Sequence, residues 1–446
     1  MSLSKKRSPL QSVVQAILTV CLLIISSPAR GQFTQATLPP LQEIYRFRGD
    51  LYRGFPSDLH VNRHGQLVTV LSNQPKSTTP LSLYLLNYSP AQGVSTFPLP
   101  FDHRVFSLSL SDWGSVVESV SRNSSPFKVL SAPFGAPLQE LFNLPVGTLG
   151  ASGINDAGVV AFASRDANNH GLRDLWRQIP GQTLESLPDV GEDSLRGPTL
   201  VDPLGRVIQS HWMNGIPPLD EATMRLEANG QWQDLTATFG ESDERVFDLI
   251  GTNSINASGD FVFASGRPDG QFFYRLNAYS AATGTATQIF SSTTDLLNGV
   301  HQLSIADNGD VLFRLGDNGN GLQAFVYRKN QNALVDLASL VPAGASLYSY
   351  PAMNQNGDIF FGAWNTSTHF NYFLLKAADS VATPISAFSN LIAPFDFLAL
   401  TNALQPYFWL QSDNQQWILG TAAVPEPPVS ILLAMLTSLA IGRRRR

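Results

Sequence analysis

The hydrophobic and polar positions of this chain follow one pattern that recurs along most of its length. An apolar residue is followed by Asn or Asp, two variable positions, Gly, one variable position and two or three apolar residues. Asn or Asp can bond the backbone ahead of it, and Gly accepts the positive φ that closes a tight turn. The flanking apolar residues favour strands, so each copy predicts a hairpin. The copies are Val61–Val68, Leu110–Val117, Ile154–Phe162, Val201–Ile208, Ile255–Phe263, Ile305–Phe313 and Met353–Phe361.

The copies are evenly spaced. From Gly65 to Gly357 their glycines are 49, 44, 47, 54, 50 and 48 residues apart, and a weaker eighth copy, Asp413–Leu419, has Gln415 in place of Gly. In four copies an aromatic or apolar strand ends in a base 16 to 19 residues after the glycine, and a further apolar segment follows. Each period therefore holds four predicted strands. The bases are Arg177, Arg275, Arg328 and Lys376.

Four-stranded units at this period predict an all-β fold, a β-propeller of four-stranded blades. Because one such sheet cannot bury both faces, blades pack against each other around an axis. A repeating barrel or open β-solenoid is the alternative, although solenoid coils are usually shorter. The bases that end the third strands are interpreted as solvated edge charges that oppose aggregation. The aromatic residues of these strands are assigned to the core between blades rather than to a sugar platform: Trp176, Tyr274, Tyr327 and Phe373.

The two ends of the repeat region are predicted to close the ring. The segment Pro40–Phe47 resembles Pro137–Leu144, which is assigned as the fourth strand of the first repeat. The eighth repeat, near residues 408–421, has only a first hairpin. The N-terminal strand is therefore expected to complete this last blade, giving seven full repeats and a split eighth. Closure matters because an open ring exposes sheet edges.

The N-terminus carries Lys5, Lys6 and Arg7, then an apolar run over Val13–Ile25 and small residues up to Gly31. This order predicts a secretory signal peptide over residues 1–31, cleaved after Ala29 or Gly31. An uncleaved membrane anchor is the alternative, but the run is short for a span of about 20 residues. The only cysteine, Cys21, lies in this run, so the mature chain contains no cysteine.

The C-terminal 23 residues contain Val424-Pro425-Glu426-Pro427, an apolar run over Val429–Ile441 and a terminal arginine cluster. A basic cluster after an apolar helix stays in the cytoplasm. This segment, residues 424–446, resembles the PEP-CTERM sorting signal of Gram-negative bacteria that make exopolysaccharide. The resemblance implies transient anchoring in the inner membrane, processing by an exosortase-type enzyme and a final place at the cell surface or in the extracellular matrix. An ordinary tail anchor is the alternative. The arginines that would act as the cytoplasmic stop are Arg443, Arg444, Arg445 and Arg446.

Composition limits the classes of function that are expected for the repeat region, residues 32–423, which we call the body. The whole chain has a net charge of −6, but residues 31–423 hold 29 − 8 = 21 basic and 35 − 1 = 34 acidic residues, a net charge of −13. A body this acidic is not expected to bind nucleic acid. A single cysteine excludes a disulfide framework and cysteine-based metal sites.

Candidate chemistry in the body is sparse. Zinc-protease, nucleophile-elbow, phosphate-loop and dinucleotide-binding motifs are all absent. The histidines His60 and His64 have helical spacing but flank a strand and a turn. Asp166–Gly171 with Asp174, and Asp317–Gly321, partly mimic calcium loops, but turn chemistry explains them without a metal. We therefore expect no catalytic residues, no metal and no cofactor.

The sequence predicts a secreted, surface-sorted protein with a binding or structural role and no catalysis. Its expected partners are signal peptidase, an exosortase-type processing enzyme and extracellular polysaccharide. The alternative is an extracellular hydrolase or lyase that acts on polysaccharide at the mouth of the propeller. A calcium-dependent, lectin-like binder is a third hypothesis.

Overall fold

The computed structural model describes residues 42–48, 59–72, 83–99, 104–120, 127–144, 147–149, 152–166, 174–188, 194–212, 222–228, 230–235, 246–249, 254–266, 274–292, 300–315, 323–348, 350–365, 369–385, 395–411 and 416–421. All of them belong to one compact unit, Leu38–Arg446. This part of the chain is all β, apart from the short 3-10 helices η1 (Lys329–Gln331) and η2 (Leu337–Leu340). Both predicted terminal signals, residues 1–31 and 424–446, lie outside the described residues.

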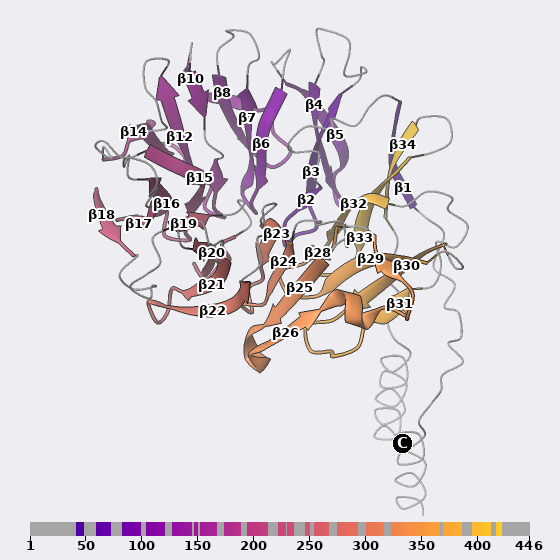
Figure 1. Ribbon diagram of the computed structural model, residues 1–446. Helices are drawn as coiled ribbons and strands as arrows, with labels where there is room; N and C mark the ends of the chain where they lie inside the picture. Colours follow the sequence, from indigo (N-terminus) through magenta and orange to yellow (C-terminus); the bar gives the residue numbers. More distant parts are fainter. Residues whose placement is uncertain are drawn as a thin grey trace, which may run out of the picture. The chain divides into compact units, whose positions relative to one another are not determined.

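The strands form eight antiparallel sheets, each the blade of a β-propeller, so the predicted fold class is confirmed. Figure 1 shows the sheets following one another around a ring. We number the blades in chain order. Blade 1 holds β2 (His60–Val61), β3 (Leu67–Ser72), β4 (Leu83–Ser89) and β5 (Gly93–Pro98); blade 2 holds β6 (Arg104–Leu110), β7 (Gly114–Val120), β8 (Phe127–Pro133) and β9 (Gln139–Leu144).

Blade 3 holds β10 (Gly147–Leu149), β11 (Gly153–Ile154), β12 (Val160–Asp166), β13 (Asp174–Gln178) and β14 (Glu185–Ser186); blade 4 holds β15 (Ser194–Val201), β16 (Val207–Trp212), β17 (Ala222–Ala228) and β18 (Gln231–Asp234). Blade 5 holds β19 (Val246–Leu249), β20 (Phe261–Gly266), β21 (Tyr274–Ser280) and β22 (Thr285–Ser292). In blades 4 and 5 consecutive strands pair as neighbours, as the sequence pattern predicts, whereas in blade 3 the short strands β10 and β11 both pair with β12.

Blade 6 holds β23 (Val300–Ile305), β24 (Val311–Leu315), β25 (Gln323–Arg328) and β26 (Ala333–Asp336); blade 7 holds β27 (Ser346–Leu347), β28 (Ala352–Met353), β29 (Ile359–Asn365), β30 (His369–Leu375) and β31 (Thr383–Ile385). Blade 8 holds β32 (Phe395–Leu400), β33 (Pro406–Gln411), β34 (Gln416–Thr421) and β1 (Gln42–Arg48). The ring is thus seven blades built from consecutive residues and one built from both ends of the repeat region.

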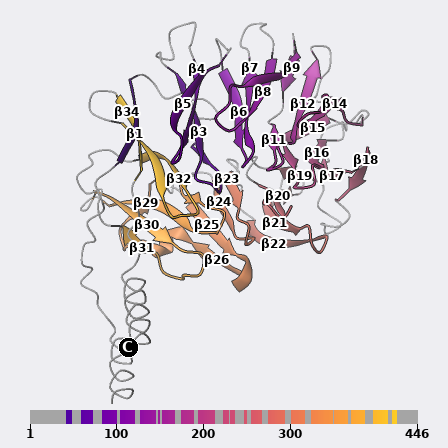
Figure 2. The same ribbon diagram turned by 180° about the vertical axis from the view of Figure 1, so that it is seen from behind.

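Strand β1 closes the ring, which confirms the predicted split blade. It pairs with β34 antiparallel, from Gln42 opposite Thr421 to Arg48 opposite Gln416. Figures 1 and 2 both show β1 beside β34. Its residues Ile44 and Tyr45 pack on a core shared by blades 8 and 1. The strand that β1 resembles, β9, is the outer strand of blade 2 and not of the first repeat.

The prediction of the eighth repeat was wrong in its position. The turn that matches the other copies is Thr401–Gln405, where Thr401 N donates to Gln405 O at 3.0 Å. It has Leu404 at the glycine position, with φ of 59°. The segment predicted as the eighth turn instead falls between β33 and β34, partly outside the described residues. The error arose because a leucine in the left-handed region breaks the glycine pattern.

Gly114 was also misread as a turn glycine. In blade 2 the turn is shorter, with Ser111 N donating to Gly114 O at 2.9 Å. Gly114 is the first residue of β7, and a Cβ there would lie 2.0 Å from the carbonyl oxygen of Ala132. Glycine is therefore required here by the close approach of β8.

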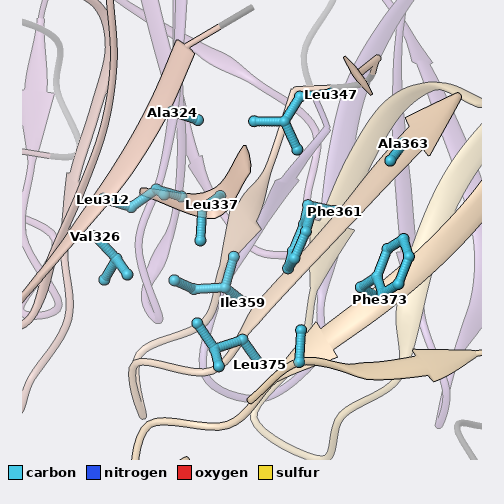
Figure 3. Packing of buried hydrophobic residues seen from close by; sticks show 11 residues of the cluster. Leu312, Ala324, Val326, Leu337, Leu347, Ile359, Phe361, Ala363, Phe373 and Leu375 are labelled. Carbon is cyan, nitrogen blue, oxygen red and sulfur yellow. The ribbon is translucent and has the colours of Figure 1, made fainter. Parts of the chain in front are cut away.

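Neighbouring blades share apolar cores. Between blades 6 and 7, Leu312 and Val326 pack against residues such as Ile359 and Phe361 of the next sheet (Figure 3). Phe373 and Tyr327 are buried, which confirms their predicted place in the core. Trp176 of blade 3 is half-buried against Phe142 of blade 2, with ring centroids 5.2 Å apart. The side chain of Tyr274 lies outside the described residues.

The first prediction concerns closure. Ile44→Asp places a charge against the apolar core that joins blades 8 and 1, so it should lower the free energy of unfolding by about 2–3 kcal/mol. Urea unfolding of the variant measures this loss. Glu43→Gln is the matched control, because the Glu43 side chain is exposed on the same strand and pairs only with Arg46. An Ile44→Asp variant as stable as the control would show that β1 does not hold the ring closed.

Candidate functional site

In blades 1, 3, 5 and 7 the turn between the first two strands is built around one asparagine side chain. In blade 3, Asn155 Oδ1 accepts hydrogen bonds from Ala157 N at 3.0 Å and Val159 N at 2.9 Å. Gly158 closes this turn with φ of 80°. Asn62, Asn256 and Asn354 accept the corresponding two bonds in blades 1, 5 and 7. The predicted role of Asn in the repeat is therefore confirmed.

The same asparagines also join neighbouring blades. Asn155 Nδ2 donates to Asp202 O of blade 4 at 2.8 Å, and Asn256 Nδ2 donates to Ala306 O of blade 6 at 3.0 Å. Asn62 and Asn354 bond Ser111 O and Thr401 O in blades 2 and 8 in the same way. Because these asparagines are buried, each bond satisfies an amide N–H group that has lost its contact with water.

The amide bridge alternates around the ring. Blades 2, 4, 6 and 8 have Ser111, Asp202, Ala306 and Thr401 at the asparagine position. Asp202 caps its own turn by accepting from Leu204 N and Arg206 N, but an ionised carboxylate has no hydrogen to donate onward. The ring is therefore composed of four bridged pairs: blades 1–2, 3–4, 5–6 and 7–8.

First strands and turns of all eight blades line one central cavity of about 270 Å³. The residue just before each turn contributes an apolar side chain to this wall. The same position of all eight repeats therefore forms an apolar belt around the axis. Its members are Val61, Leu110, Ile154, Val201, Ile255, Ile305, Met353 and Leu400.

The cavity wall contains three ionisable residues among those that the structure describes: His60, Asp156 and Asp307. Asp156 Oδ1 accepts from Asp112 N at 3.0 Å, and Asp156 Oδ2 pairs with Arg63. Asp307 Oδ1 accepts from Ala257 N at 3.1 Å. Both carboxylates therefore hold the turn of a neighbouring blade.

An ion network joins the turns of blades 1, 2 and 3 beside the cavity. Arg63 pairs with both Asp112 and Asp156, and its backbone N–H also donates to Asp112 Oδ1 at 3.3 Å. His64 Nε2 lies 3.5 Å from Asp112 Oδ2, with most of its side chain exposed. His60 and His64 thus lie on β2 and its turn, where the sequence placed them, and His64 has a carboxylate neighbour in Asp112.

The bases that end the third strands are not solvated edge charges in blades 3 and 6, so that interpretation was wrong. Arg177 Nη1 lies 2.6 Å from Glu227 Oε2 and also donates to Gly205 O, both in blade 4. Arg328 is buried and donates to Gly357 O at 2.7 Å and Lys376 O at 3.1 Å in blade 7. Because a buried guanidinium needs several acceptors, these arginines clamp one blade to the next.

The fifth repeat departs from this pattern. Arg275 is the second residue of β21 and does not end it, so the sequence assigned its strand boundary wrongly. In blade 7 the base that follows β30, Lys376, contributes its backbone carbonyl to the clamp of Arg328. The clamp residues could not be recognised from the sequence, because their partners lie 28 to 50 residues away in another blade.

One buried histidine has a strongly shifted pKa. His211 on β16 is fully buried, its ring meets Trp232 edge-on with centroids 4.6 Å apart, and Arg225 Nη1 lies 3.5 Å from its Nδ1. Burial, followed by the charge of Arg225, lowers the pKa of His211 to about 3. The imidazole is therefore neutral in the folded state at neutral pH.

The residues predicted to carry function lie elsewhere. The sorting motif Val424–Pro427 and the stop Arg443–Arg446 are outside the described residues. The two calcium-like loops fall between second and third strands of blades 3 and 6, largely outside the described residues. In the described ranges no group of three or more His, Cys, Asp or Glu side chains could hold a metal. Over the same ranges, no helix has the length and apolar character to cross a bilayer.

Comparison with known proteins supports the β-propeller fold and does not assign a family or a function. No family model and no curated protein matches the chain. Among solved structures, Porphyromonas gingivalis dipeptidyl peptidase 4 is 10% identical with a TM-score of 0.51, over 81% of this chain and 57% of that one. The β-propeller domain of the Trilobed protease from Pyrococcus furiosus is 9% identical with a TM-score of 0.46, over 76% of this chain and 99% of that one. Such identities show a shared fold alone.

A second prediction tests the amide bridge. Asn354→Ala removes two caps within the turn and the bond to Thr401 O, so it should lower the free energy of unfolding by about 2–4 kcal/mol. Asn356→Ala in the same turn is the matched control, because Asn356 is exposed and loses only its 3.3 Å bond to Asn402 O. Chemical unfolding should show less than about 1 kcal/mol for the control. Equal losses would refute a special role for Asn354.

A third prediction follows from His211. The unfolded chain gains a proton on this histidine below its ordinary pKa of 6.5, whereas the folded chain does not until about pH 3. Stability should therefore fall as pH drops from 6.5 towards 3, by up to about 1.4 kcal/mol per pH unit from this group, with no contribution above 6.5.

Measuring unfolding free energy from pH 7 to pH 4.5 tests this. His211→Phe keeps an aromatic ring against Trp232 but cannot titrate, so its stability should decline less steeply than that of the wild type. Asn356→Ala, which removes no titratable group, should leave the slope unchanged. Parallel slopes for His211→Phe and the wild type would contradict the assignment.

Proposed function

We propose that this protein is a secreted, surface-sorted β-propeller that binds or organises extracellular polysaccharide without catalysis. The observation that carries the proposal is the central cavity, the usual site of chemistry in a closed ring. Apolar side chains and polar groups of the turns line it together, and its two carboxylates each hold a neighbouring turn. A glycosidase instead needs two carboxylates that face one another across a sugar.

Charge and composition support the extracellular part of the proposal. The body has a net charge of −13 and no cysteine once a signal peptide is removed. Stability must then come from blade packing and ring closure, both of which the fold provides. The resemblance of residues 424–446 to a PEP-CTERM signal supports sorting to the surface, with Glu426 in the recognised motif and Arg443–Arg446 as the stop.

A fourth prediction tests sorting. In the host cell, Glu426→Ala should abolish C-terminal processing, and deletion of Arg443–Arg446 should reduce retention during processing. The measurement is fractionation with immunoblotting of the full chain. Wild-type protein should be found shortened at the surface or in the matrix, and the Glu426→Ala protein unshortened in the inner membrane. Unaltered processing of both variants would overturn the sorting proposal.

The surface form of the wild type then tests the absence of catalysis. Incubation with neutral and acidic polysaccharides should release no reducing ends or unsaturated products. If products appear and Asp156→Asn or Asp307→Asn abolishes them, the protein is an enzyme of the cavity and the proposal fails. Asp379→Asn, on the exposed turn after β30, serves as the control substitution.

A further inference from the structure

Blade 7 exposes an unusual group of aromatic side chains. Six large apolar residues are exposed in the part of the chain that the structure describes, and three of them lie in one stretch of this blade: Tyr348 (49%), Tyr350 (47%) and Trp364 (40%). The repeat pattern does not include them, which is why the sequence did not single them out. Exposed aromatic groups of this kind mark interaction sites more often than chance.

Strand pairing places two of these rings on one face of the sheet. Trp364 lies opposite Ser346 on one side and opposite Phe370 on the other. Tyr348 N donates to Gly362 O at 3.0 Å, so Tyr348 lies opposite Gly362, two residues from Trp364. Directly opposed residues of antiparallel strands share a face, and so do residues two apart. Tyr348, Trp364 and Phe370 are therefore on the same face.

This face runs from the core into solvent. Near the turn, Phe360 and Tyr372 are buried and stacked, with centroids 5.6 Å apart and planes 9° apart. They pack against residues of blade 8 such as Phe408. Further along the same strands, Phe370 is half-buried and holds the Tyr348 ring edge-on, with centroids 4.7 Å apart. The exposed Tyr348 ring is thus held in place by a half-buried neighbour.

The third exposed ring, Tyr350, is not part of this group. It lies between β27 and β28, where two extra residues separate the pairs Leu347–Ala363 and Ala352–Phe360. The guanidinium of Arg314 from blade 6 lies 4.0 Å from the centre of the Tyr350 ring, whereas the face that carries Phe370 packs against blade 8. The cation–π contact holds the Tyr350 ring in place on the side of blade 6.

We propose that Tyr348 and Trp364 form a platform on which β-linked glucose-type or xylose-type units of an uncharged polysaccharide stack. This inference rests on the proposed function and specifies its ligand. Sugar rings with equatorial hydroxyls present flat C–H faces that suit aromatic rings, while Tyr and Trp edges supply polar partners. A body of net charge −13 disfavours an acidic polymer.

The size of the platform favours a sugar chain over a protein. A stable protein interface buries about 800 Å² on each partner and involves roughly 20–30 residues. The aromatic platform, with the polar edges of its rings, has the size of a few units of a polysaccharide chain. Rigid aromatic side chains also lose little conformational entropy on binding.

The fifth prediction is a binding experiment on the surface form of the protein, with cellohexaose as the probe. Wild type should bind it more tightly than mannohexaose, whose axial hydroxyls disturb one face of each unit. The Tyr348→Ser/Trp364→Ala variant should bind cellohexaose at least tenfold more weakly by calorimetry. Trp364→Phe should keep most of the binding but lose the part of the tryptophan fluorescence change that comes from Trp364.

Val381→Ser is the matched control, because Val381 is exposed (71%) on the same blade but outside the platform. It should bind like the wild type, and circular dichroism checks that all variants are folded. Equal binding by the platform variant and wild type would overturn the inference while leaving polysaccharide binding by the protein intact. Loss of self-association in the platform variant, measured by ultracentrifugation, would instead assign the patch to a second copy of the chain. Release of sugar products would count against the proposed function and not against the platform.

Discussion

The fold depends on one constraint: each blade must have a neighbour on both of its faces. A four-stranded sheet has two faces to cover, and a ring covers them all only if its last blade meets its first. In this chain the antiparallel pairing of β1 with β34 fulfils that condition by uniting both ends of the repeat region in one sheet. With Cys21 as its single cysteine, the chain has no internal disulfide to reinforce this join. Its closure relies on backbone pairing, on the core around Trp409 and Tyr407 and on the bond from Tyr407 to Gly65 O.

The period of the sequence was sufficient to predict the blades, because hairpin turns and strand alternation are encoded within about ten residues. The split eighth blade was also predictable, since Pro40–Phe47 carries the composition of an outer strand. What failed was local detail that depends on other blades. Gly114 looks like a turn glycine until the backbone of β8 is seen against it, and Leu404 occupies a conformation that its residue type rarely adopts. Arg177 and Arg328 read as surface charges because their acceptors are a full blade away.

The candidate site was less predictable than the fold for the same reason. Repeated positions build the cavity wall, and the sequence therefore suggests its apolar belt. The aromatic group on blade 7 is an exception to the repeat, so its significance comes from burial and pairing and not from periodicity. Departures from a repeat are where an individual propeller differs from a generic one. Here the departure is the three exposed rings, because an interrupted first strand, like that of β27 and β28, also occurs in blade 3 as β10 and β11.

The alternation of the asparagine amides has a mechanical consequence. Successive asparagines at Asn62, Asn155, Asn256 and Asn354 are 93, 101 and 98 residues apart, so each bridged pair spans roughly a hundred residues. The seams between pairs lack this amide, and the join between blades 8 and 1 is one of them. Other interactions hold the remaining seams, since the Arg328 clamp and a shared apolar core join blades 6 and 7, and the Arg63 network joins blade 3 to blades 1 and 2. When the ring is pulled by its ends, load falls directly on the pairing of β1 with β34, so the ring should open at this join before the other blades separate.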